Sequence, residues 1–280
     1  MLNKKLAIFI ALTGSLTACS TLTGRHDTAA QIAAAGGLHE RIIPAGIFNL
    51  TAWERTGEPG APADVYIEGD GLAWLNKYTK SLNPTPPDPL ALRLAALDKN
   101  NNVIYIARPC QYTGWNNAGA CPDRYWTNAR TAPEVIEAYR QVLDNLKAAD
   151  HITAFNLIGY SGGAAVAILA AAERTDIASL RTVAGNTDYA VFSALHGVSA
   201  VDASQAPEDM ALKLAHLPQQ HFIGGKDAVV QADIFNGWER ASGASACIHS
   251  TVVPEASHDR GWTEKWQELL EIRPECKTYP

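Results

Sequence analysis

The chain of 280 residues lacks several patterns that mark common classes of protein. It has no run of basic residues and a formal net charge of −6, which argues against nucleic-acid binding because phosphate recognition needs clustered Lys and Arg. It has no Gly-rich phosphate-binding motif and no His-Glu-x-x-His motif, and its eight His residues lack metal-ligand spacing. The sequence therefore implies no cofactor and no metal site.

The first apolar run, residues 6–16, is too short to cross a bilayer as a permanent helix. It follows Lys4 and Lys5 and leads to Leu-Thr-Ala-Cys, ending at Cys19, an order typical of a secretion signal. The last four residues resemble the bacterial lipobox, whose Cys becomes the first mature residue and carries a diacylglyceryl group. The resemblance implies a signal peptide over residues 1–18 and a lipid on Cys19 that anchors the protein in the bacterial cell envelope. By the same resemblance, Ser20 in place of Asp after the Cys implies the outer membrane of a Gram-negative cell, with the protein facing the periplasm. An ordinary cleaved signal with an incidental Cys is the alternative.

Cysteine is otherwise scarce, with four residues after Cys19: Cys110, Cys121, Cys247 and Cys276. An even number in an exported protein indicates disulfides. Of the three possible pairings, the one that joins neighbours in sequence is the simplest because it closes two short loops. Buried free thiols are the alternative.

Residues 19–45 are rich in small side chains and are expected to form a tether, followed by one domain over residues 46–280. Strand-like and helix-like segments alternate in this domain. The pattern predicts an α/β fold with a mainly parallel central sheet and helices on both faces. Such sheets place their ligands beyond the carboxyl ends of the strands.

The segment Gly-Tyr-Ser-Gly-Gly, residues 159–163, follows a predicted strand and opens a predicted helix. It matches G-x-S-x-G, in which a sharp strand-to-helix turn exposes the Ser hydroxyl. This makes Ser161 the candidate nucleophile. A Ser that only caps the helix is the alternative.

A Ser hydroxyl needs a His to take its proton, and the His needs a carboxylate to orient it. Asp227 lies in the turn after the predicted strand 220–223, and His258 follows the predicted strand 248–253. Asp188, after an earlier strand, is a rival for the acid. His258 could also be an ordinary loop residue, and Asp227 a turn-forming one.

These three turns, in the order Ser, Asp, His, resemble the α/β-hydrolase superfamily over residues 46–272. The resemblance implies that the Gly162 N–H is one oxyanion donor. It also implies a second donor in the loop 68–74, where Asp70 stands in place of the family's His; we expect the Leu72 N–H. A plain Gly-rich turn is the alternative for this loop.

Four aromatic residues are candidates for binding substrate, although packing is an equal explanation for the Trp residues: Tyr160, Trp74, Trp115 and Trp126. The expected activity is hydrolysis of a small carboxylic ester through a covalent acyl-enzyme. A peptidase, amidase or acyltransferase with the same triad is an alternative, as is a non-catalytic binding lipoprotein of the envelope. The sequence does not specify the acyl group, the leaving group or the oligomeric state.

Overall fold

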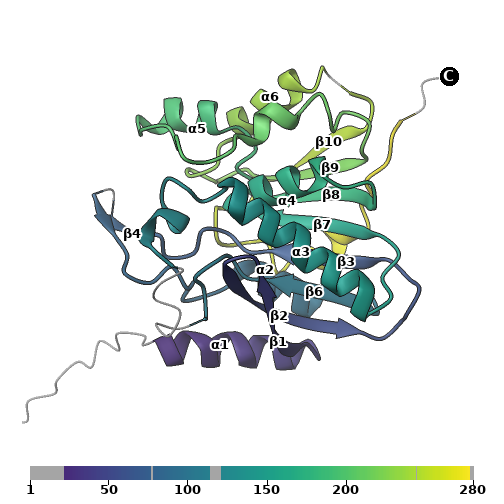
Figure 1. Cartoon of the computed structure of the whole chain (residues 1–280). Helices are drawn as coiled ribbons and strands as arrows, with labels where there is room; N and C mark the ends of the chain where they lie inside the picture. The colour runs from purple at the N-terminus through teal and green to yellow at the C-terminus, as the bar shows by residue number, and fades with distance from the viewer. Residues whose placement is uncertain (1–21, 77, 114–120, 244, 278–280) are drawn as a thin grey trace, which may run out of the picture.

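The computed structural model describes residues 22–76, 78–113, 121–243 and 245–277 (Figure 1). Its centre is an eight-stranded sheet with the order β1-β2-β6-β3-β7-β8-β9-β10. The strands of this sheet are β1 (His39–Ala45), β2 (Phe48–Thr56), β3 (Ala63–Ile67), β6 (Asn102–Ile106), β7 (Phe155–Tyr160), β8 (Ile177–Val183), β9 (Gln219–Gly224) and β10 (Ile248–Val253). A separate hairpin consists of β4 (Trp74–Asn76) and β5 (Thr79–Lys80).

The sheet is mainly parallel. The pairs β1–β2 and β2–β6 are antiparallel, and every other neighbouring pair from β6 to β10 is parallel. The carboxyl ends of the parallel strands therefore lie along one edge, where the turns that follow β3, β7, β9 and β10 come together. The predicted α/β fold class is confirmed.

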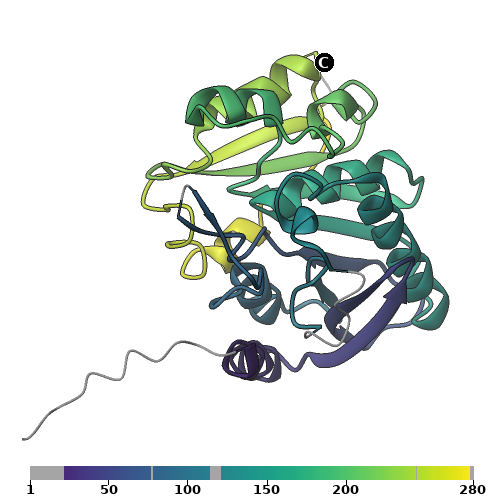
Figure 2. The ribbon, with the colours of Figure 1, turned by 60° about the vertical axis from the view of Figure 1, so that its left-hand side comes forward.

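Helices cover both faces of the sheet, as Figure 2 shows. One layer contains α3 (Pro133–Ala149), α4 (Gly162–Ala172) and α6 (Ala232–Ala241), and the other contains α1 (Leu22–Ala35), α2 (Leu90–Leu97) and α7 (Trp266–Leu270). The remaining helix, α5 (Tyr189–His196), packs on α6.

Strand β3 illustrates why two cores form. Its side chains alternate between the faces, as they must in any strand, and all five of its residues are buried. Val65 and Ile67 belong to the core under α3 and α4, whereas Tyr66 belongs to the other core, where its ring lies 6.0 Å from that of Trp266. A strand buried on both faces reads as a continuous apolar run rather than an alternating one.

Residues 22–45 differ from the expected tether, because they form α1 and β1. The small side chains that suggested a flexible segment include several Ala residues, which favour a helix once one face is covered. Ala29 and Ala33 are buried against the α2 side of the molecule, and β1 pairs along its whole length with β2. The folded domain therefore includes these residues. Residues 1–21, with Cys19, lie outside the described part of the chain.

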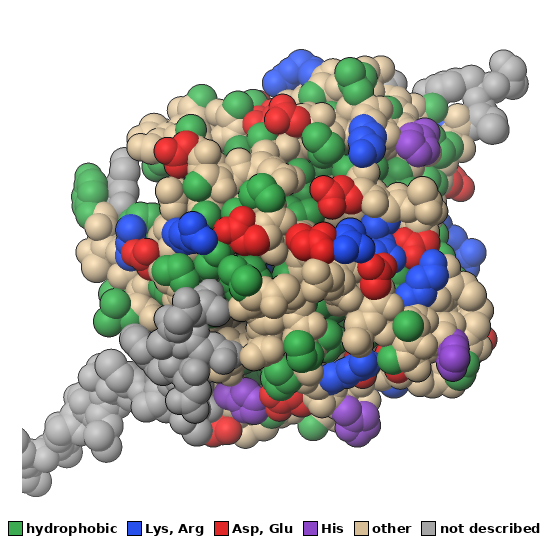
Figure 3. Space-filling model, viewed as in Figure 1, with side chains coloured by type: hydrophobic (Ala, Val, Ile, Leu, Met, Phe, Trp, Pro, Cys, Tyr) green, Lys and Arg blue, Asp and Glu red, His purple; other side chains and the backbone are tan. Residues whose placement is uncertain are grey.

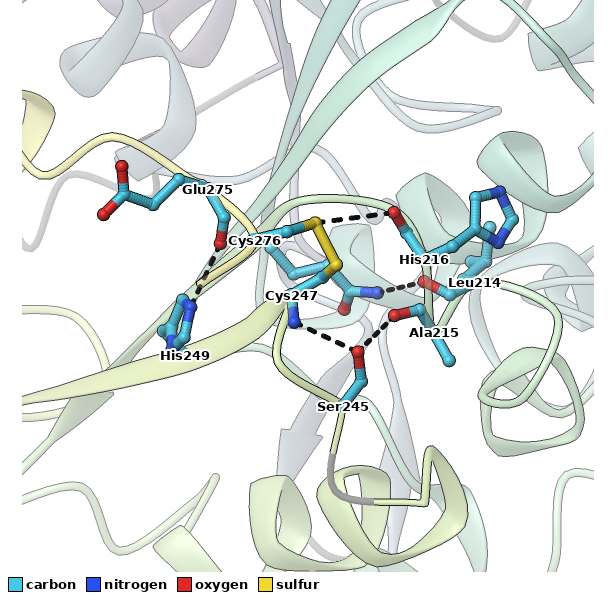
Figure 4. Close-up of a disulfide and its surroundings, with 9 residues drawn as sticks. Leu214, Ala215, His216, Ser245, Cys247, His249, Glu275 and Cys276 are labelled. Carbon is cyan, nitrogen blue, oxygen red and sulfur yellow. Dashed lines mark hydrogen bonds between the residues drawn. A yellow bond between two sulfur atoms is a disulfide. The ribbon is translucent and has the colours of Figure 1, made fainter. Parts of the chain in front are cut away.

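Two disulfides are present, Cys110–Cys121 and Cys247–Cys276, which is the pairing with the shortest loops. Figure 4 shows the second bridge, which joins the segment before β10 to the C-terminal segment after α7. In the described parts of the chain, no helix has the length and apolar character needed to cross a membrane.

Candidate active site

The turn between β7 and α4 holds Ser161 in an unusual backbone conformation, with φ 51° and ψ −121°. Positive φ is strained for a residue with a side chain and is maintained only when the surroundings enforce it. Here the Ser161 N–H donates to the Val183 carbonyl at 3.0 Å, and the Ser161 carbonyl accepts from the Asn186 N–H at 3.0 Å. The neighbouring strand and its turn therefore help to enforce this backbone conformation of Ser161.

Glycines on both sides of Ser161 allow this turn to pack closely. A Cβ atom on Gly159 would lie 2.5 Å from Ala164 Cα, and one on Gly163 would lie 2.3 Å from the Ile67 carbonyl oxygen. Both distances are below any normal contact, and both neighbours are backbone atoms. Any larger residue at either position would push α4 away from β3 and β7.

Three side chains from three separate turns form a continuous chain of contacts. Ser161 Oγ lies 3.0 Å from His258 Nε2, and His258 Nδ1 lies 2.9 Å from Asp227 Oδ2. The Asp227 side chain is fully buried, whereas the His258 side chain is 21% exposed. The arrangement fits an imidazole whose Nδ1–H donates to the carboxylate, which leaves Nε2 to accept the proton of the hydroxyl.

The second carboxylate oxygen fixes the direction of Asp227. Its Oδ1 accepts from the Val229 N–H at 2.7 Å and the Val230 N–H at 2.8 Å. The rival acid, Asp188, lies elsewhere: it caps α5 by accepting from the Val191 N–H at 2.8 Å. The structure thus brings Asp227 to His258 and assigns Asp188 to the start of a helix.

Two aromatic side chains hold the histidine turn. Tyr160 donates from its hydroxyl to the His258 carbonyl at 3.2 Å, and Trp262 donates from its indole to the Ser257 carbonyl at 2.8 Å. The contact of Tyr160 is with the protein backbone rather than with an open cleft. Trp262 was not identified from the sequence, although an aromatic residue four positions after the histidine was a usable signal.

The turn after β3 lies beside the nucleophile. A Cβ atom on Gly69 would lie 3.2 Å from Ser161 Cβ. In this turn the Leu72 N–H donates to the Pro84 carbonyl at 3.0 Å, and the Gly69 N–H donates to Glu68 Oε1 at 2.9 Å. The amide of Asp70 forms no hydrogen bond within the described part of the chain, and the same is true of the Gly71 and Gly162 amides. The amide expected to be an oxyanion donor, that of Leu72, is therefore already engaged.

Asp70 is held by two guanidinium groups that the sequence did not reveal. Its Oδ1 accepts from Arg108 Nη1 at 2.9 Å, and its Oδ2 accepts from Arg130 Nη1 at 2.6 Å. Burial alone would raise the pKa of Asp70, but Arg130 and Arg108 outweigh it and hold that pKa below its ordinary value. The carboxylate packs against Gly162, where a Cβ atom would lie only 2.2 Å from Asp70 Oδ1.

Glu68, at the carboxyl end of β3, is a further buried carboxyl beside this turn. Burial raises the pKa of Glu68 to about 7, despite hydrogen bonds from the Gly69 N–H and the Tyr105 hydroxyl that favour its charged form. Its direct bond to the Gly69 amide links its charge to the turn next to Ser161.

The three Trp residues that are candidates for binding substrate differ in their environments. Trp126 is 8% exposed and donates from its indole to the Ser81 carbonyl at 3.1 Å, which is a packing role. Trp74 is 39% exposed and lies on the β4–β5 hairpin. Trp115 lies outside the described residues.

No protein-family model matches the chain, and no curated protein sequence matches it. Several solved structures are similar to it. An esterase of Pyrococcus furiosus is similar with a TM-score of 0.59 at 14% identity, over 85% of this chain and 92% of the other. An esterase domain of a Rhodothermus marinus protein gives a TM-score of 0.57 at 14% identity, over 84% and 95%. An alpha-beta serine hydrolase homologue from Coxiella burnetii gives 0.52 at 17% identity, over 84% and 94%.

At these identities the likeness concerns the fold, and it covers most of each chain. The mainly parallel sheet and its helices on both faces agree with this likeness. The chain has the α/β-hydrolase fold.

Proposed function

We propose that the protein is a serine hydrolase of carboxylic esters that acts through a covalent acyl-enzyme. The observation that carries the proposal is the contact chain from Ser161 Oγ to His258 to Asp227, at 3.0 and 2.9 Å. The three side chains lie within hydrogen-bond reach of one another in the order that a nucleophile, a base and an orienting carboxylate require, and this supports the proposal. The esterases among the similar structures support an ester rather than an amide as the substrate.

In the first half-reaction, Ser161 Oγ attacks the ester carbonyl carbon while His258 Nε2 takes the hydroxyl proton. Asp227 holds the imidazole in the required tautomer and favours the imidazolium that forms. The proton then passes from His258 to the leaving alkoxide as the carbon–oxygen bond breaks. Water attacks the acyl-Ser161 ester in the second half-reaction, again with His258 as base, and releases the acid.

Two backbone amides would bind the oxyanion that forms during each attack. Gly162 N–H, at the start of α4, is one. For the other we propose the Asp70 N–H in place of Leu72, because Leu72 donates to Pro84 whereas the Asp70 amide is unengaged and follows Gly69, which lies against Ser161.

A carboxylate this close to the oxyanion would oppose catalysis if it were alone. Arg108 and Arg130 each bind one oxygen of Asp70, so the cluster carries one negative and two positive charges. The resulting field favours the oxyanion, and the two fixed hydrogen bonds hold the turn that presents the Asp70 amide.

Hydrolysis of short p-nitrophenyl esters by the full chain tests the proposal. We expect the wild type to turn over the ester. Ser161→Ala removes the nucleophile and Asp227→Asn favours the wrong tautomer of the base, so each should lower kcat by about 10⁴-fold or more. Ser250→Ala, at an exposed position on β10, is the matched control and should retain wild-type rates. Equal rates for Ser161→Ala and Ser250→Ala would contradict the proposal.

We also propose that the protein is anchored in the cell envelope by a lipid on Cys19. The lipobox-like segment supports the anchor, and the two disulfides support an oxidising compartment. The mass of the protein extracted from membranes of a bacterial host should equal that of residues 19–280 plus a diacylglyceryl group and any amino-terminal acyl chain. Cys19→Ser should abolish the lipid adduct; a wild-type mass without lipid would contradict the anchor.

A further inference from the structure

Four large side chains that are exposed gather on and just after the β4–β5 hairpin. Trp74 is 39% exposed, Leu75 60%, Tyr78 86% and Leu82 79%. Figure 1 shows the hairpin projecting from the body of the molecule, and Figure 3 shows hydrophobic side chains at the same edge. We call these four residues the apolar tip. Scattered exposed apolar residues are normal, but four within nine residues on a projecting element indicate a contact surface.

The backbone that carries the apolar tip is well held. At the base, the Ser81 N–H donates to the Ala73 carbonyl at 2.9 Å, and the Trp126 indole donates to the Ser81 carbonyl. At the turn, Asn76 Oδ1 accepts from the Tyr78 and Thr79 amides at 2.9 and 3.0 Å. The exposure of the tip is thus a property of an ordered hairpin.

The hairpin emerges beside the start of the folded chain. Arg25, in the first turn of α1, donates to the carbonyls of Asn83 and Thr85, at 3.3 and 2.7 Å, just after the apolar tip. Cys19 precedes the first residue of α1, Leu22, by three positions, and three residues span at most about 10 Å. A lipid on Cys19 would therefore enter the bilayer near the hairpin.

We propose that the apolar tip docks into the surface of the lipid bilayer to which the chain is anchored. This rests on the proposed lipid at Cys19. Trp and Tyr are favoured at the headgroup level of a bilayer because they combine an apolar ring with a polar atom, and Leu gains by burial below it. The anchor supplies the first attachment and the apolar tip the second, which fixes one orientation of the domain on the membrane.

This orientation would place the candidate active site close to the lipid surface. The hairpin continues from the oxyanion turn. Trp74 comes four positions after Asp70, which packs against Gly162, so the Cα atoms of Asp70 and Trp74 are at most about 14 Å apart. Esters carried in the bilayer would then reach Ser161 more readily than dissolved ones.

Tryptophan quenching tests the docking directly. The full chain is reconstituted into phosphatidylethanolamine–phosphatidylglycerol vesicles with and without brominated acyl chains. The other tryptophans that the structure describes are buried, so a Trp74→Phe variant isolates the contribution of Trp74. We expect bromine near the headgroups to quench wild-type fluorescence more strongly than bromine near the bilayer centre, and the quenched fraction to disappear in Trp74→Phe.

A triple variant, Leu75→Ser with Tyr78→Ser and Leu82→Ser, keeps Trp74 but removes its apolar neighbours, and it should lose the quenching. Leu212→Ser, at a 73% exposed position outside the hairpin, is the matched control and should keep it. Equal quenching in wild type and Trp74→Phe, or full quenching in the triple variant, would overturn docking. The quenching requires no turnover, so it is independent of whether Ser161 is catalytic.

Discussion

The two ends of strand β3 carry aspartates in contrasting surroundings. At the carboxyl end, Asp70 receives two guanidinium groups, which hold its pKa below the ordinary value although burial opposes them. At the amino end, Asp64 receives side-chain amides from Asn100 and Asn156. Burial raises the pKa of Asp64, and the nearby carboxylate of Asp98 raises it further.

The difference shows what each end of the strand requires. Neutral amides satisfy the hydrogen bonds of a buried carboxylate but do not offset the loss of hydration of its charge, whereas guanidinium groups do both. Close to Ser161, the two Arg residues keep Asp70 charged. At the far end of the strand, neutral hydrogen bonds hold the Asp64 carboxyl in place without favouring its charged form to the same extent. Glu68, between the two, receives only neutral donors, and its pKa lies near 7.

Replacing Asp70 by Asn should have the largest effect. It leaves Arg108 and Arg130 without their shared carboxylate, and breaking a buried ion pair in this way costs about 3–5 kcal/mol; the partial exposure of Asp70 favours the lower value. Urea denaturation measures the loss. If the account of the oxyanion turn is right, kcat for ester hydrolysis also falls while KM changes little. Wild-type kcat in a folded Asp70→Asn protein would contradict that role.

Replacing Glu68 by Gln should change how stability depends on pH. The folded pKa of about 7 lies above the ordinary 4.5, so the folded state retains a proton that the unfolded chain has lost. Wild-type stability therefore falls as pH rises from about 4.5 to about 7, and the variant lacks this fall. Relative to wild type, Glu68→Gln should gain about 3 kcal/mol across that range in denaturation measured at several pH values. A constant difference would show that Glu68 does not titrate there.

Asp64→Asn is the matched substitution at the other end of the strand and should have the smallest effect. Its pKa is raised above 3.8, so its contribution to stability is present below that pH and is lost as pH rises through the folded pKa. At pH 8 we expect a change below about 1 kcal/mol and no effect on kcat. A loss as large as that of Asp70→Asn would remove the contrast between the two ends.

Much of the fold was predictable because its signals are local. The buried strands read as apolar runs and α3 shows helical spacing, so the α/β class followed from their alternation. Ser161 stood out because it lies in a G-x-S-x-G motif, and Asp227 and His258 stood out because each lies in a turn after a predicted strand. Residues 22–45 did not, because an Ala-rich helix and an edge strand depend on α2 and β2 for their burial.

The contacts around the candidate site were less predictable because they join distant segments. Arg108 and Arg130 reach Asp70 across 38 and 60 residues, and nothing local to either Arg indicates that partner. Leu72 was favoured by analogy with a His-Gly turn, and its bond to the Pro84 carbonyl depends on the path of a loop with several Pro residues. The burial of Trp126 likewise depends on the hairpin, which no periodic pattern predicts.

Labelling of the full chain with a fluorophosphonate, followed by mass spectrometry of its peptides, tests the central claim most directly. An activated serine forms a stable covalent adduct, so the account predicts modification of the peptide that contains Ser161 and no labelling of Ser161→Ala. It also predicts much slower labelling of His258→Gln, since the hydroxyl loses its base. A folded wild-type protein that does not label, or that labels only at another residue, would contradict the proposed hydrolase.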